Sequence, residues 1–440
     1  MKTDSRLRHV AYGLLGMPLA MSALPIYVQV PAYYTGSLGL ALAGTGWVLF
    51  LARLIDTVQD PWLGRCIDRL DGRRLSLWLI AGAAILALAF WGVWLPPQPV
   101  RADSTALLTW LAAMLIVAYV AHSMLNIAYM SWGARLAGHA DGLLGAAAMR
   151  ELAGLLGAVI AGAIPSLILA GNSTVSSSVD AQLRAYGGAF ALLLGVSLIA
   201  LLYFAPPWRK IAGGVIGWRA SMASMKANIG FRRLLLPFFL NAVSMAIPVT
   251  LALFFINDRL QLPQYAGVFL GGYFLASACG LPLWVMAAKR LGVLKTWRIG
   301  MLLAIAAFGC ATLLGPGDAW GYAAVCVVAG FALGADLSLP PVLLATMIEK
   351  DDSTAAYYGV WTLLGKLSLA IAGLTLPLLA LLGYQPGTAA GMPLTWVYAV
   401  IPCAFKLAAL LLLKSLHALT GERASSLSPI TSTDPQESPS

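Results

Sequence analysis

The sequence predicts an all-α membrane protein with twelve transmembrane helices in two six-helix lobes. Three observations support this prediction. The 440-residue chain is 60% hydrophobic and only 10% charged, whereas soluble domains carry about 25% charged residues. It contains twelve apolar runs, each close to the roughly 20 residues that a helix needs to span a bilayer. Its basic residues recur in every second connection between these runs.

The apolar runs define the expected helices. Along the chain they occupy residues 10–34, 39–64, 75–95, 106–132, 143–170, 186–205, 232–256, 264–288, 296–314, 319–347, 357–383 and 394–416. An even number of spans places both chain ends on the same side of the membrane.

The basic residues predict which side that is. They gather in the N-terminal tail, in the connections after the second, fourth, sixth and eighth helices, and after the last helix. The alternate connections differ: residues 172–186 are rich in Ser, and residues 384–394 carry no charge. Because short basic loops stay in the cytoplasm, both termini are expected in the cytoplasm of a bacterial-type inner membrane. This pattern also accounts for the net charge of +10 without any nucleic-acid partner.

One long basic connection divides the chain into two halves. We expect an N-terminal lobe over residues 1–205, a cytoplasmic linker over 206–231 and a C-terminal lobe over 232–418. Residues 419–440 are expected to form a disordered cytoplasmic tail, because their end is rich in Ser, Thr and Pro. Lobes of this size enclose a path within one chain, so a monomer is expected.

Ionisable side chains inside the expected helices indicate function, because each costs about 2.5–3.5 kcal/mol at bilayer depth. Asp56 and Asp60 lie four residues apart in the second helix and share one face, with Arg53 one turn earlier. The two carboxylates and the Thr57 hydroxyl offer hard oxygen ligands to a sodium ion, and the carboxylates also suit a shared proton. The alternative is an Arg53–aspartate salt bridge that only stabilises packing.

Two further helices each carry one isolated charge. Lys366 has no acid in its own apolar run, so Asp56 or Asp60 is its expected partner; the alternative is a lysine that snorkels to the interface. Asp336 lies in the middle of the tenth helix and is a candidate protonation site. It is equally consistent with a neutral acid hydrogen-bonded to backbone that the two following prolines leave free.

The fourth and fifth helices contain the candidate substrate-binding residues. Asn126 and Tyr129, with Trp132, place hydrogen-bonding and aromatic groups along one helix, although aromatic residues at this spacing also serve in packing. Arg150 opens the fifth helix beside Glu151. It either binds a polar group of the substrate or forms a gate pair with Glu151 at the cytoplasmic interface.

No enzyme signature competes with this interpretation. The sequence contains no Walker loop, no HExxH and no GxSxG motif. We therefore expect no catalytic activity, and no cofactor other than a sodium ion or a proton as coupling ion. The expected partners are a small-molecule substrate and the lipid bilayer.

The second-helix motif Arg53-x-x-Asp56-x-x-x-Asp60-Pro61-x-x-Gly64 resembles that of the glycoside–pentoside–hexuronide:cation symporters, a group within the major facilitator superfamily that includes the melibiose permease. Three further matches follow in chain order: Asn126-x-x-Tyr129, Arg150, and Lys366 within Tyr358-Gly359-x-Trp361-x-x-x-x-Gly365-Lys366. The turn after the second helix resembles the cytoplasmic-loop motif of the superfamily, with the gate residues Gly64, Asp68, Arg69, Gly72, Arg73 and Arg74.

The resemblance implies a two-lobed major facilitator fold that works by alternating access. It implies that Asp56 and Asp60 bind the coupling cation, with Lys366 as their electrostatic competitor or partner. Melibiose-type members hold sugar hydroxyls with acids in the first and fourth helices. Here the first helix reads Gly16-Met17-Pro18-Leu19-Ala20-Met21, and the fourth offers Asn126 in place of an acid.

The expected function is therefore symport of a small organic solute with sodium or protons. A sugar or glycoside fits the resemblance, and a less hydroxylated solute fits the missing acids. The alternative is a proton-linked exporter of an amphipathic compound.

Overall fold

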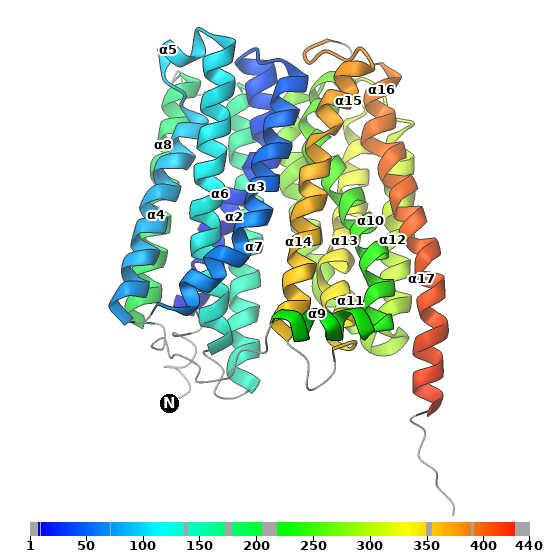
Figure 1. Cartoon of the computed structure of the whole chain (residues 1–440). Coiled ribbons are helices and arrows are strands. Elements are labelled where there is room, and N and C mark those ends of the chain that lie inside the picture. Colours follow the sequence, from blue (N-terminus) through cyan, green and yellow to red (C-terminus); the bar gives the residue numbers. More distant parts are fainter. Residues whose placement is uncertain are drawn as a thin grey trace, which may run out of the picture.

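The computed structural model describes residues 8, 10–70, 72–135, 140–171, 178–204, 218–348, 354–388 and 391–426. Within these ranges, eleven helices are long and apolar enough to cross a membrane. A further helix, α3 (Leu42–Asp68), has 27 residues and is about 40 Å long at 1.5 Å per residue. Its charged side chains lower its hydropathy, but it runs beside the others (Figure 1). With α3, the described part of the chain contains the twelve long helices that the sequence predicts.

The helices form two lobes, which are blue to green and green to red in Figure 1. The N-terminal lobe contains α2 (Gly16–Ala32) continued by η1 (Tyr33–Ser37), α3, α4 (Gly72–Trp94), the short α5 (Gln98–Arg101), α6 (Ser104–Arg135), α7 (Ala140–Leu169) and α8 (Val179–Phe204). The C-terminal lobe contains α10 (Ile229–Phe254) continued by η2 (Phe255–Arg259), η3 (Pro263–Tyr265), α11 (Ala266–Leu291), α12 (Val293–Ala311), α13 (Ala319–Ala345), α14 (Thr354–Gly373), α15 (Thr375–Leu381), α16 (Met392–Thr395), η4 (Trp396–Val400) and α17 (Ile401–Ser426). Two lobes of six long helices each are the architecture that the sequence predicts.

The two ends of the bundle differ in charge. We call the end where α3 meets α4 the basic end, and the opposite end, which carries α5, the far end (Figure 1). The basic residues of the helix ends and turns at the basic end are Arg65, Arg69, Arg73, Arg74, Lys226, Arg232, Arg233, Lys289, Arg290 and Lys295. The side chain of Arg135 and the N-terminal residues 1–7 lie outside the described part.

The outer surface of the bundle is apolar. Leu88 on α4 and Leu192 on α8 are 73% and 70% exposed, and both lie in the middle of their helices. Helices satisfy their own backbone hydrogen bonds, so such a surface is stable against lipid tails. The polar side chains Asp56, Asp336 and Lys406 are instead buried inside the protein.

Two element boundaries differ from those the sequence predicts. Helix α8 begins at Val179, within the stretch expected to be a loop up to residue 186. The Ser178 hydroxyl accepts a hydrogen bond from the Ala181 amide, and Asp180 lies in the first turn, where a helix favours negative charge. Arg101 pairs with this Asp180 at 3.1 Å. These polar contacts begin the helix earlier than hydropathy indicates.

The second difference is at the C-terminus. Helix α17 continues to Ser426, beyond residue 418, where the sequence predicts the end of the lobe. Residues between 414 and 424 include Leu, Ala, Glu and Arg, which are good helix formers, so the helix extends past its apolar part. Residues 427–440 of the expected tail lie outside the described part, as do residues 205–217 of the expected linker. The rest of that linker contains the helix α9 (Trp218–Ala227).

The lobes pack together at the far end through glycines. A Cβ atom at Gly46, near the start of α3, would lie 2.7 Å from the carbonyl oxygen of Gly373 on α14. A Cβ atom at Gly267 on α11 would lie 2.8 Å from the carbonyl oxygen of Ala163 on α7. Only residues without a side chain allow helices to approach this closely. The structure is therefore closed at the far end.

We expect Gly46→Ala to open the far end. The added methyl group forces the α3 and α14 backbones apart, at about 1–3 kcal/mol for the closed state, so the population of open molecules should rise by about tenfold or more. The measurement is the rate at which a maleimide labels Ser166→Cys, a position between the lobes at the far end that is only 2% exposed in the closed structure, after the five native cysteines are replaced.

The matched control is Gly44→Ala, two residues away on the same helix. Its Cβ atom would lie 3.4 Å from the Leu108 side chain, which is ordinary contact within one lobe. Equal labelling rates in the two alanine variants would show that the Gly46 contact does not hold the lobes together.

Candidate functional site

The charged face of α3 lies inside the protein. Arg53, Asp56 and Asp60 follow one another at spacings of three and four residues, so the helix turns them to one side. Asp56 is only 1% exposed and Arg53 only 8%. A carboxylate at this depth requires partners that replace its lost hydration.

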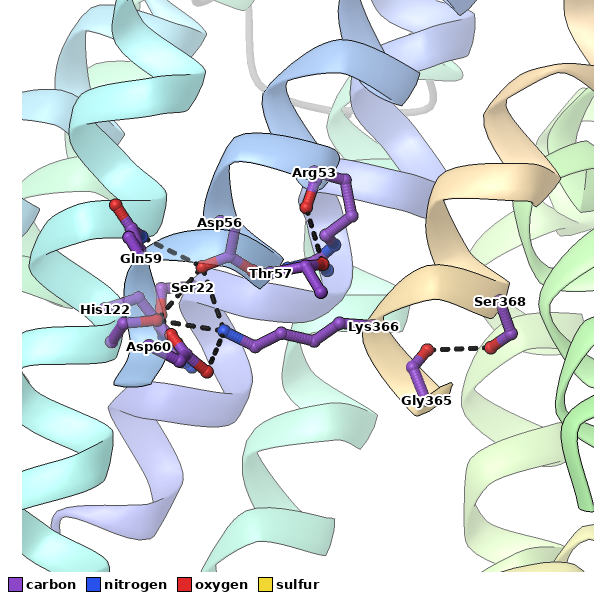
Figure 2. A network of polar contacts seen from close by, with 11 residues as sticks. Ser22, Arg53, Asp56, Thr57, Gln59, Asp60, His122, Gly365, Lys366 and Ser368 are labelled. Atoms are coloured by element: carbon purple, nitrogen blue, oxygen red, sulfur yellow. Dashed lines mark hydrogen bonds and ion pairs between the residues drawn. The ribbon is translucent and has the colours of Figure 1, made fainter. Parts of the chain in front are cut away.

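The Asp56 carboxylate has such partners in its own lobe. Its Oδ2 atom accepts a hydrogen bond from Arg53 Nη1 at 2.9 Å. Its Oδ1 atom accepts hydrogen bonds from Gln59 Nε2 at 3.1 Å and from Ser123 Oγ of α6 at 3.0 Å (Figure 2). Both oxygens are thus held by donors with fixed positions.

Arg53 is itself held by aromatic rings of neighbouring helices. Its guanidinium lies 4.3 Å from the ring centre of Tyr119 on α6 and 5.6 Å from that of Tyr27 on α2. Stacking on aromatic faces stabilises a desolvated cation. Arg53 therefore provides a fixed positive charge on one side of Asp56.

Lys366 reaches the same carboxylates from the other lobe. This lysine lies on α14, and its Nζ atom is 3.0 Å from Asp56 Oδ1 and 2.6 Å from Asp60 Oδ2. It also donates a hydrogen bond to Ser123 Oγ at 3.1 Å. The contact that the sequence predicts between Lys366 and the second-helix aspartates is thus present, and it joins the two lobes (Figure 2).

The four charges balance one another. Two carboxylates, Asp56 and Asp60, face two cations, Arg53 and Lys366. The ammonium of Lys366 has three oxygen neighbours, which is a hard-ligand arrangement of the kind that binds simple cations. Among the described residues, Asp60 Oδ1 is buried and has no hydrogen-bond partner. The cluster thus keeps one carboxylate oxygen free for a further ligand.

Sequence comparison identifies the family of this chain. The profile of the family described as MFS/sugar transport protein matches residues 9–416. The chain belongs to this family. It is therefore a multi-pass membrane transporter of the major facilitator superfamily and not an enzyme. A search of curated protein sequences finds no match.

Solved transporters share the fold. A mutant of the nucleoside transporter NupG superposes with a TM-score of 0.70, at 13% identity, over 94% of this chain and 99% of that chain. A bacterial homologue of the human lysosomal transporter Spinster, in an inward-facing and unoccupied conformation, gives 0.66 at 13% identity, over 96% and 97%. A bacterial homologue of the iron transporter ferroportin, in an inward-facing state, gives 0.64 at 16% identity, over 93% and 98%. At these identities the likeness concerns the fold alone, and the narrower resemblance to cation symporters stays a prediction.

In this MFS transporter, the candidate residues Thr57 and Tyr129 both form hydrogen bonds to backbone carbonyls. Thr57 donates its hydroxyl proton to the Arg53 carbonyl at 2.9 Å, one turn back on its own helix. Tyr129 is 1% exposed, and its hydroxyl donates to the carbonyl oxygen of Tyr12 at 2.9 Å. The rings of Tyr12 and Tyr129 lie 4.5 Å apart. Tyr129 thus packs α6 against the segment before α2, as in the packing alternative, while Asn126 is half-buried on α6.

Arg150 has the neighbour that the gate-pair alternative predicts. Its Nη2 atom lies 2.6 Å from Glu151 Oε1, and its Nη1 atom donates to Met130 Sδ at 2.6 Å. Both charged side chains are partly exposed. Among the described residues, no polar side chain of the C-terminal lobe contacts Arg150. Its role in substrate binding stays a prediction.

The gate motif lies at the basic end, as expected. Gly64 is on α3, Arg69 follows its end, and Gly72, with a φ of +37°, begins α4 together with Arg73 and Arg74. The side chain of Asp68 and the whole of residue 71 lie outside the described part. The role of this motif therefore stays a prediction.

A second buried charge pair lies entirely within the C-terminal lobe. Lys406 Nζ of α17 is 2.6 Å from Asp336 Oδ2 of α13, and it donates to Asn241 Oδ1 of α10 at 2.7 Å. Asp336 Oδ1 accepts hydrogen bonds from Asn241 Nδ2 at 3.1 Å and from Trp297 Nε1 of α12 at 2.9 Å. Asp336 thus forms an ion pair with a lysine, a contact that neither of the two sequence interpretations of this residue included.

Several polar residues of these clusters were missed from the sequence, Asn241 among them. Gln59 and Ser123 are uncharged, so a search for buried charges passes over them, although Ser123 lies one helical turn before Asn126. Lys406 lies in the middle of the last apolar run, which contains no acidic residue. The reasoning that singled out Lys366, a lysine in an apolar run without an acid, therefore applies to Lys406 as well. His122, beside Ser123, has its Nδ1 atom 3.1 Å from Ser22 Oγ of α2.

Proposed function

We propose that this protein is a cation-coupled secondary transporter of a small organic solute, and that Asp56 and Asp60 bind the coupling cation. The observation that carries the proposal is the position of Lys366 Nζ between the two carboxylates, with Ser123 Oγ as a third oxygen neighbour. Oxygens that surround an ammonium ion are also suitable ligands for a sodium ion, and the two carboxylates are suitable acceptors of a proton.

Charge balance makes Lys366 and the cation competitors. With Arg53 and Lys366 in place, the cluster is neutral, and an added cation leaves one uncompensated positive charge in a low-dielectric interior. Binding of the cation therefore requires that Lys366 withdraw. Because Lys366 belongs to α14 and the carboxylates belong to α3, this exchange breaks an ion pair between the lobes.

Breaking this ion pair links cation binding to movement of the lobes. A ligand shifts a conformational equilibrium only by its difference in affinity for the two states. Here the difference arises because the ammonium occupies the site in the far-end-closed structure. Thr57, Asn126 and Arg150 are kept as secondary candidates for cation and substrate contacts, and a sugar or glycoside is one candidate substrate.

The test is the thermal stability of the purified protein in sodium, in lithium and across pH. A cation that binds only the folded protein stabilises it by about 2.7 kcal/mol at a hundredfold excess over its dissociation constant. We expect sodium to raise the unfolding temperature of the wild type and not of Asp56→Asn. The control is Asp103→Asn, an exposed acid that caps the start of α6, because asparagine keeps the cap.

Each result has a distinct meaning. If pH alone affects stability, and Asp56→Asn removes that effect, the coupling ion is the proton. If neither ion nor pH distinguishes Asp56→Asn from the wild type, the cluster is a packing salt bridge and the proposed mechanism is wrong.

A proton-linked exporter of an amphipathic compound is the second candidate. It is favoured by the first helix, where Pro18, Leu19 and Met21 are buried and offer no charge to a sugar. Solute transport by proteoliposomes with an imposed proton gradient separates the two. Movement of the solute in the same direction as the protons supports symport, and movement in the opposite direction supports proton-linked export.

We further infer that the basic end faces the cytoplasm of a bacterial-type inner membrane, with both termini on that side. The basic helix ends and turns at this end support the assignment. Labelling of intact cells with an impermeant maleimide should reach Ser37→Cys and not Arg69→Cys; the reverse pattern would invert the orientation.

A further inference from the structure

A cavity of about 280 Å³ lies between the two lobes at the far end, away from the charge cluster of α3. The N-terminal lobe contributes Tyr33, Ser37 and Ser166 to its wall, and the C-terminal lobe contributes Phe254, Asn257 and Asp258. Its volume is just below the range of about 300–1,000 Å³ that is usual for sites of small organic ligands. The cavity is therefore large enough for a small molecule that touches both lobes.

The cavity wall contains a carboxylate without a cationic partner. Among the described residues, Asp258 forms no ion pair. The neighbouring Arg259 is turned away, because its Nε atom donates to the Leu314 carbonyl at 3.1 Å. The Asp258 carboxylate is therefore open to a cationic partner supplied by a ligand.

Two hydrogen bonds hold the Asp258 carboxylate in place. The Tyr384 hydroxyl donates to Oδ2, and the Gly387 amide donates to Oδ1 at 3.2 Å. Burial and the nearby Asp258 carboxylate raise the pKa of Tyr384, so its hydroxyl remains a donor. A carboxylate offers about four acceptor positions, so each oxygen retains the capacity to bind a donor in the cavity.

The aromatic groups of the wall complement this charge. The Tyr33 hydroxyl is already used, since it donates to the Trp94 carbonyl at 3.2 Å. Phe254 comes from the opposite lobe and has its ring 6.3 Å from that of Tyr384, in an edge-on arrangement. Tyr33 and Phe254 line the same cavity as Asp258, and aromatic rings beside a carboxylate suit an organic cation with an apolar body.

We propose that this cavity binds a small organic cation with an apolar body, such as an alkylammonium or arylammonium ion, which stabilises the far-end-closed conformation. The ammonium group pairs with Asp258, and the apolar body lies between Tyr33 and Phe254. Because these residues belong to different lobes, the ligand binds the closed state better than an open one and shifts the equilibrium accordingly. The site is separate from Asp56 and Asp60 and does not depend on the identity of the coupling ion.

The experiment measures binding of benzylammonium to the purified full-length protein by calorimetry and thermal unfolding. Benzyl alcohol, which is similar in size and uncharged, is the comparison ligand. We expect saturable binding of benzylammonium, and affinity weaker by about tenfold or more in Asp258→Asn, because a charged hydrogen bond is lost. Asp318→Asn, which changes another acid at the same end of the same lobe, should bind as the wild type does.

Two further variants make the test decisive. Gly36→Leu adds a bulky side chain to the cavity wall, where a Cβ atom at Gly36 meets nothing within 4 Å, and leaves Asp258 in the sequence; it should weaken or abolish binding even if Asp258→Asn does not fold. Gly46→Ala, which disfavours the closed far end, should weaken binding without altering the cavity wall. The proposal is overturned by absence of saturable binding, by equal affinity for benzyl alcohol, by unchanged affinity in both Asp258→Asn and Gly36→Leu, or by loss of binding in Asp60→Asn alone.

Discussion

Lys406→Met is expected to destabilise the protein by about 3–5 kcal/mol, because it leaves the Asp336 carboxylate buried without its counter-charge. Asp336 and Lys406 are 7% and 3% exposed, so water does not replace the lost partner. Asn241 and Trp297 still donate to Asp336 Oδ1, but Oδ2 loses its 2.6 Å partner. The measurement is the unfolding temperature of the purified variant, with denaturant unfolding as a second probe.

The double variant Asp336→Asn/Lys406→Met is the informative control. It removes both charges, so it should be more stable than Lys406→Met alone, and the coupling between the two sites should be of the order of 0.5–3 kcal/mol. Lys289→Met, at an exposed lysine of the basic end, should have a negligible effect. If the double variant is no more stable than the single one, Asp336 does not depend on Lys406, and the pair is not the structural link between α13 and α17 that the contacts indicate.

The fold was predictable because the membrane constrains it. Every backbone polar group in lipid must be satisfied within a helix, so apolar runs near 20 residues translate directly into spans. Helix α3 shows the limit of hydropathy: with Arg53, Asp56 and Asp60 it is not among the eleven apolar spans, although the mostly apolar run over residues 39–64 predicts it. The start of α8 at Val179 was not predictable by hydropathy, because Ser178 and Asp180 begin that helix with polar contacts.

The site was predictable only where charge is involved. Lys366 has no acid in its own helix. Because burying an unpaired charge costs free energy, a partner on another helix is expected, and the structure contains it in Asp56 and Asp60. Gln59 and Ser123 carry no such signal, since an uncharged polar group costs much less to bury and is satisfied in many ways. Tyr129 is a candidate substrate-binding residue in the sequence, but aromatic residues at helical spacing serve packing as well as binding. Only the structure, in which the Tyr129 hydroxyl donates to the Tyr12 carbonyl, favours packing.

Replacing Lys366 with glutamine is expected to tighten binding of the coupling cation and, at the same time, to disconnect it from movement of the lobes. Without the ammonium, Asp56 and Asp60 face Arg53 alone, so the cluster carries one net negative charge. Loss of a charged competitor that makes three polar contacts should raise the affinity for sodium by about tenfold or more. Equilibrium binding of radioactive sodium to the purified protein measures this change, with Lys289→Gln as the control for charge alone.

The loss of coupling follows from where Lys366 is attached. In the wild type, sodium and the ammonium of α14 compete for the same oxygens of α3, so bound sodium releases one lobe from the other. In Lys366→Gln the cation has no competitor from the opposite lobe, and its affinity becomes similar in both conformations. A ligand with equal affinity for two states shifts nothing, however tightly it binds. Sodium should therefore alter the maleimide labelling rate of the buried position Ser166→Cys when Lys366 is present and leave it unchanged in the glutamine variant. If the variant binds sodium and its labelling still responds as in the wild type, the link between cation and conformation passes through groups other than Lys366.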